Sequence, residues 1–194
     1  MLTSITPFGE RGRGQRWWLT ATWLTIGHGA GGLVLGLALV VLAAGRNEIG
    51  GAVSADVQLW SIAVAAVAAA IFDLSGGRLP GRRQVDERWL TTYRGWVYGV
   101  GFGFQLGLGF VTVVNTALFL VVIGAGVIIG GQQALWLGGL YGAVRAVMAL
   151  LNARVRTVEE LKVLHRRLDG IGPALRVGGG ILTGVSATVA VMVA

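Results

Sequence analysis

Long apolar runs with almost no charged residues constrain this chain more than any other feature. Charged side chains make up only 13% of its 194 residues, against about 25% in soluble domains, and they gather in four short clusters. The runs between the clusters reach the length of about 20 residues that a helix needs to cross a bilayer. We therefore expect an all-α integral membrane protein, with a single polytopic transmembrane domain over residues 1–194.

The sequence predicts about five transmembrane helices, of which the third is long and interrupted. At about 1.5 Å per residue, the third run exceeds one straight crossing. It could instead hold two helices joined by a tight turn near Phe110. The predicted spans cover residues 17–44, 54–74, 95–131, 133–152 and 173–194, with loops at 75–94 and 153–172.

The distribution of basic residues favours a single crossing by the third run. Loops on the cytoplasmic side of membrane proteins are enriched in Arg and Lys. With one crossing, the N-terminal segment and the 75–94 and 153–172 loops share one side, and only Arg46 lies opposite. We predict a multi-pass protein of the cytoplasmic (inner) membrane, with its N-terminus in the cytoplasm and its C-terminus outside. The net charge of +7 is then a topology signal, and we expect no nucleic-acid partner.

The loop over residues 153–172 carries a helix signature. Thr157 and Glu160 form a capping box, an apolar stripe follows, and Gly170 is expected to end the helix. This pattern predicts a short amphipathic helix on the inner membrane surface, in contact with anionic lipid. The competing interpretation is a helix that docks on a partner protein.

Glycines recur at a spacing of four residues, as they do where membrane helices pack closely. In lipid, helices gain little from burying apolar surface against each other, so close approach of their backbones matters more. We interpret these glycines as helix-packing residues rather than as a site. The set comprises Gly32, Gly36, Gly95, Gly99, Gly103, Gly107, Gly138 and Gly142.

Four polar residues within the predicted spans form the candidate substrate or ion site. They are His28, Gln105, Asn115 and Arg145. A charge inside a span costs several kcal/mol, so Arg145 should face the bundle or extend to the headgroups. His28 could carry a proton, but a hydrogen bond to a backbone carbonyl across a glycine-lined contact is the more ordinary role. Residues such as Gln105 and Asn115 more often serve as hydrogen-bonding contacts between helices than as a site.

Catalytic and metal-binding signatures are missing from the sequence. There is no cysteine, no His-Glu-x-x-His, no phosphate-binding loop and no nucleophile elbow. Asp56 and Asp73 mark the ends of a span, so no buried carboxylate is expected. We predict a protein that is not an enzyme, with no cofactor and no metal site.

The first and third spans contain similar glycine-rich segments, at residues 26–36 and 100–110. Together with the interrupted run at 101–109, this repeat resembles the transmembrane domain of the cytochrome c biogenesis and thiol:disulfide interchange family. The resemblance implies a shared scaffold around a broken helix. It does not imply that family's electron transfer, because the chain has no cysteine.

Two functions fit the sequence. One is a small transporter or permease-like protein, with its site between the first, third and fourth spans. The other is a non-catalytic accessory or structural subunit of a larger membrane complex, which would bring a partner membrane subunit. A homo-oligomer is compatible with either function.

Overall fold

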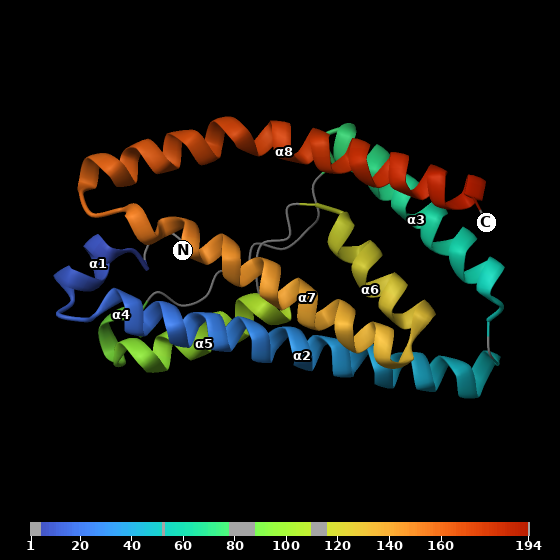
Figure 1. The fold of residues 1–194 in the computed structure, drawn as a ribbon, viewed down its shortest axis with the longest axis horizontal. Coiled ribbons are helices and arrows are strands. Elements are labelled where there is room, and N and C mark those ends of the chain that lie inside the picture. Colours follow the sequence, from blue (N-terminus) through green and yellow to red (C-terminus); the bar gives the residue numbers. More distant parts are fainter. Residues whose placement is uncertain (1–4, 52, 78–87, 110–115, 194) are drawn as a thin grey trace. The chain divides into compact units, whose positions relative to one another are not determined.

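In a computed structural model, which describes residues 5–51, 53–77, 88–109 and 116–193, every regular element is a helix (Figure 1). The all-α class predicted from the sequence is thus confirmed. The helices are α1 (Pro7–Gly12), α2 (Trp17–Gly50), α3 (Ala55–Leu74), α4 (Trp89–Thr92), α5 (Gly95–Leu108), α6 (Leu118–Ile129), α7 (Gly131–Leu150), the 3-10 helix η2 (Leu151–Arg154) and α8 (Val158–Val193).

Three helical segments of the described chain are long and apolar enough to cross a membrane. They are Trp17–Gly50, Ala55–Leu74 and Gly131–Arg154, where η2 continues α7. They coincide with the first, second and fourth predicted spans, and α2 runs beyond the predicted end at residue 44 to Gly50.

The third predicted span contains two separate helices, α5 with 14 residues and α6 with 12. α5 ends at Leu108 because Gly109 follows with φ +82°, a left-handed conformation that glycine adopts without strain. At about 1.5 Å per residue, neither helix alone is long enough to cross about 30 Å of hydrocarbon.

The predicted end of the surface helix at Gly170 is wrong. α8 is continuous from Val158 to Val193, so the expected loop at 153–172 is helical from residue 158 and joins directly to the predicted span at 173–194. A glycine inside a helix costs only about 1 kcal/mol relative to alanine, which is too little to end a helix by itself. The capping box at the start of α8 is confirmed, since Thr157 Oγ1 accepts from Glu160 N at 3.2 Å and Glu160 Oε2 accepts from Thr157 N at 3.2 Å.

The chain divides into two compact units. Unit 1 comprises Met1–Leu35, Arg82–Val113 and Gly138–Asp169, and unit 2 comprises Gly36–Gly81, Val114–Leu137 and Gly170–Ala194. Unit 1 therefore holds α1, α4, α5, the first half of α2 and most of α7. Unit 2 holds α3, α6, the second half of α2 and most of α8.

Candidate functional site

In unit 1, α5 packs against the first half of α2 through glycines on both helices (Figure 1). Gly99 lies against Thr20, Gly103 against Leu24, and Gly107 against His28. Successive glycines of α5 thus meet successive turns of α2, so the two helices run in the same direction. A Cβ on Gly103 would overlap the carbonyl oxygen of Leu24, and backbone cannot move aside as a side chain can.

An adjacent side of α2 packs against α7 in the same manner. A Cβ on Gly32 would lie 2.5 Å from the carbonyl oxygen of Gly138, and one on Gly142 would overlap the carbonyl oxygen of His28. Here residue numbers rise along α2 as they fall along α7, so these helices are antiparallel. α2 is therefore the central helix of unit 1, with α5 and α7 pressed against it.

His28 lies where the three helices meet. Its backbone is in contact with Gly107 of α5 and Gly142 of α7, and the residue is only 1% exposed. The ring atom Nδ1 lies 2.7 Å from the carbonyl oxygen of Leu24. Because a carbonyl oxygen only accepts, Nδ1 carries the hydrogen, and in the neutral ring Nε2 keeps a lone pair for another partner.

Arg145 lies on α7 three residues after Gly142, the glycine whose position packs against the backbone of His28. The two candidates are therefore about one helical turn apart along the contact between α2 and α7. Arg145 Nη1 also donates to the Tyr141 hydroxyl at 3.2 Å, and the guanidinium lies 5.6 Å from the centre of the Tyr141 ring. A cation over an aromatic face is stabilised by the ring quadrupole, which offsets part of the cost of placing an arginine in a span.

The other two candidates are not joined to this pair in the described part of the chain. Gln105 lies two residues from both Gly103 and Gly107, about 200° around α5, so it faces away from the contact with α2. No hydrogen bond between described residues links its side chain to His28 or Arg145. Asn115 lies outside the described residues.

A buried carboxylate in unit 1 was not expected from the sequence. Glu10 of α1 is fully buried, and its Oε2 accepts hydrogen bonds from Thr20 Oγ1 at 2.7 Å and Tyr98 Oη at 2.5 Å. Its Oε1 pairs with Arg13 Nη2 at 2.6 Å. Glu10 is a single acidic residue in a short basic segment that gives no periodic signal, and the prediction that no carboxylate is buried is wrong.

Arg13 completes this polar cluster at the α1 end of unit 1. Burial by itself lowers the pKa of Arg13, but the hydrogen bond and negative charge of Glu10 outweigh burial, so the pKa lies above its ordinary value. Arg13 therefore keeps its positive charge at physiological pH. A buried ion pair contributes little net stability, but removing one partner leaves the other charge uncompensated.

The second buried carboxylate belongs to unit 2 and caps a helix. Asp73, at the end of α3, is 2% exposed, although the sequence placed it at the surface end of a span. Its Oδ1 accepts from the backbone N–H of Ala117 at 2.9 Å, and its Oδ2 accepts from the Thr116 hydroxyl. A carboxylate here satisfies amides that α6 leaves unpaired and favours the positive end of the helix dipole.

The opposite end of α6 receives a positive charge. Arg46, on the second half of α2, donates from Nη2 to the carbonyl oxygen of Ile128 at 3.3 Å and to Asn47 Oδ1 at 2.6 Å. The short helix α6 is thus flanked by opposite charges that match its dipole. Beside it, a groove of about 330 Å³ carries no polar side chain and is lined by Ala65, Ala68, Ala69, Phe72, Ala117, Leu120 and Val121.

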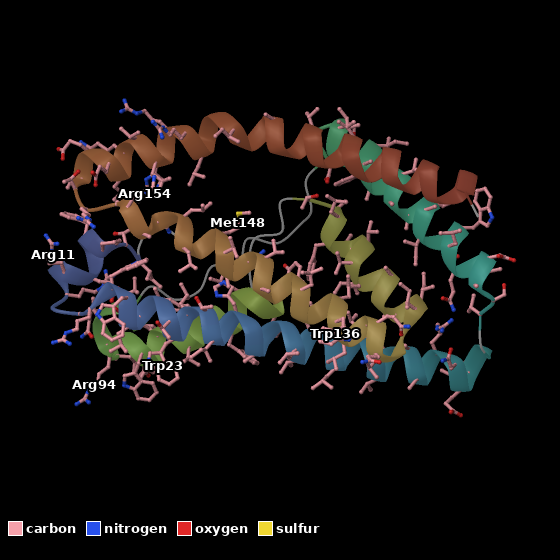
Figure 2. All side chains as sticks on the ribbon, in the orientation of Figure 1. Arg11, Trp23, Arg94, Trp136, Met148 and Arg154 are labelled. Carbon is pink, nitrogen blue, oxygen red and sulfur yellow. The ribbon has the colours of Figure 1, made fainter. Side chains whose placement is uncertain are left out.

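Basic residues mark one end of unit 1. Figure 2 shows Arg11, Arg94 and Arg154 at the same end, where α1 lies and where α2 and α5 begin. Trp23, also near this end, packs on Trp96 with ring centroids 6.1 Å apart. Arginine and tryptophan together are typical of a membrane–water interface.

Comparisons with protein families, with curated proteins and with solved structures give no match to this chain. Its function must therefore be argued from its own residues.

Proposed function

We propose that the chain is a small transporter or permease-like membrane protein whose site is centred on His28 and Arg145 in unit 1. The observation that carries the proposal is a buried imidazole at the junction of α2, α5 and α7, with Arg145 about one helical turn along α7 from the glycine that packs against it. Polar groups are costly in a span and are found there mainly at functional positions. The imidazole Nε2 and the guanidinium together suit a small anion, such as a carboxylate or phosphate.

The proposed topology has five crossings, with the basic end of unit 1 in the cytoplasm. α5 runs in the direction of the first half of α2, and α6 runs in the direction of its second half, where Gly126 meets Leu39 and Gly130 meets Ala43. α2 itself is one continuous helix over Trp17–Gly50. This supports one interrupted crossing, as in transporters that hold substrates near broken helices.

A ligand-dependent melting experiment tests the proposal. The purified protein in lipid nanodiscs is heated with phosphate, sulfate and small mono- and dicarboxylates in turn. At a concentration 100 times its Kd, a ligand stabilises the folded state by about 2.7 kcal/mol, which a melting shift reveals. We expect at least one anion to raise Tm in the native chain and to have no effect on Arg145→Ala or His28→Ala.

Two further variants serve as controls for that experiment. Thr25→Ala, on the exposed side of α2, should keep the full anion response. Gln105→Ala should lose less of the response than Arg145→Ala, since Gln105 faces away from α2. An anion response that survives in both Arg145→Ala and His28→Ala would place the site elsewhere.

A specific observation favours the second candidate function, a subunit of a larger membrane complex. The His28 ring is satisfied by the Leu24 carbonyl at 2.7 Å, as a residue with only a packing role would be. In that case the native mass of the particle, purified from its own membrane in mild detergent, would include a stoichiometric partner. Residues at the junction would then alter stability without altering any ligand response.

A further inference from the structure

The segment that precedes α2 ties together three elements of unit 1. We call residues 5–15 the N-terminal strap; it contains α1 and the turn that follows it. Its Glu10 side chain bonds to Thr20 of α2 and Tyr98 of α5. Its Phe8 N–H donates to the carbonyl oxygen of Val155 at 3.1 Å, just beyond the end of η2.

The strap also covers apolar and polar groups of α2 and α5. Ile5 packs in a cluster with Leu24, Tyr98 and Phe102, with Leu90 completing the set. Tyr98 is fully buried, Thr20 is 1% exposed and Leu24 is 3% exposed. These residues line the first turns of α2 and α5 at the basic end of unit 1.

Leu24 is the link between the strap and His28. The Leu24 side chain packs in the cluster under the strap, while its carbonyl oxygen accepts the hydrogen bond from His28 Nδ1 at 2.7 Å. Lifting the strap would therefore expose the face of α2 that leads, one helical turn further on, to the imidazole.

We infer that the N-terminal strap is a releasable closure over the α1 end of unit 1, latched by Glu10 on Tyr98 and Thr20. Beyond the packing of Ile5, the attachment consists of the hydrogen bonds to Glu10, the Phe8 backbone bond and the bond from Gly95 N–H to Gln15, so single changes can weaken it. The inference rests on the proposed function only in taking His28 as the site that the strap closes. Whether the strap opens is measurable without any ligand.

The absence of native cysteine permits a direct test by chemical labelling. A single reporter cysteine, Leu24→Cys, is placed under the strap, and its reaction with a small charged maleimide is followed in nanodiscs. We expect slow labelling in the native background. Glu10→Gln or Tyr98→Phe should raise the rate about tenfold or more, because a hydrogen bond to a charged group is among the stronger ones. The exposed Glu159→Gln should leave the rate unchanged.

A disulfide across the strap provides the converse measurement. Phe8→Cys with Val155→Cys, joined by oxidation, should reduce labelling at position 24 below the native rate, and reductant should restore it. If labelling is unaltered by Glu10→Gln, Tyr98→Phe and the disulfide, the strap is a fixed part of the fold and the inference fails. If a latch variant does not fold, the disulfide alone decides.

These results are independent of the melting experiment. Faster labelling in Glu10→Gln, together with an anion response that does not change in His28→Ala or Arg145→Ala, would support the strap inference and contradict the proposed site. Unchanged labelling, together with an anion response that is lost in His28→Ala, would contradict the strap inference and support the proposed site.

Discussion

The two units of this chain hold their short helices, α5 in unit 1 and α6 in unit 2, by different means. In unit 1, α2 is in backbone contact with α5 and α7 through glycines, and many positions have no room for even a methyl group. In unit 2, the short helix α6 is flanked by the charges of Asp73 and Arg46, next to an apolar groove of about 330 Å³. The difference predicts that the glycines of α5 that face α2 tolerate no added volume, whereas α6 depends on a few polar contacts.

The largest expected effect is that of a methyl group in the tightest contact of unit 1. Gly103→Ala should lower the free energy of unfolding by about 3 kcal/mol or more, because overpacking against backbone cannot be relieved by rotating a side chain. The measurement is unfolding by a denaturing detergent in mixed micelles. Gly29→Ala is the matched control: its Cβ would meet nothing within 4 Å, and alanine favours the helix by up to about 1 kcal/mol. Equal effects of the two variants would contradict the assignment of unit 1 to backbone packing.

An intermediate effect is expected from removal of the carboxylate that caps α6. Asp73→Ala leaves the Ala117 N–H and the Thr116 hydroxyl unpaired in a buried place, at a cost of about 1–3 kcal/mol. Amide hydrogen exchange should show the loss in α6 first, with little change in α5. Asp56→Asn, on the exposed start of α3, should leave exchange as it is. If amide exchange in α5 rose as much as in α6, the stability of α5 would depend on the Asp73 cap, which would contradict the contrast between the two helices.

The smallest effect is expected where unit 2 has free space. Ala68→Leu adds three carbons beside the apolar groove and should change the free energy of unfolding by no more than about 0.5 kcal/mol. The change is measured by the denaturing-detergent titration used for Gly103→Ala. A loss comparable to that of Gly103→Ala would show that unit 2 is packed as tightly as unit 1 and would remove the contrast between them.

The helices themselves were largely predictable from the sequence, because the bilayer sets their length. The runs at 17–44, 54–74 and 133–152 all contain or coincide with helices able to span. The break in the third run was predictable because glycine clusters there, and α5 does end at Gly109. The end of the surface helix was misplaced because a glycine weakens a helix without ending it, and α8 continues through Gly170.

The contacts of the site were far less predictable, because they join residues distant in the chain. Glu10 and Tyr98 are 88 positions apart, and Asp73 and Ala117 are 44 apart. No local periodicity indicates such pairs. The spacing of Gly27 and Gly31 does match a helix-packing motif, but only the fold shows that their partners are the backbones of residues 100–108. Gln105 had the right polarity for the site but lies on the far face of α5.

The central proposal is that the third run crosses the membrane once; within unit 1, α5 runs in the direction of the first half of α2, and within unit 2, α6 runs in the direction of its second half. The most direct test uses single cysteines at the exposed positions Thr92, Gln132 and Lys162, labelled from each side of sealed membrane vesicles. The account predicts that positions 92 and 162 are labelled from the cytoplasmic side and position 132 from the other. Labelling of positions 92 and 132 from the same side would contradict it.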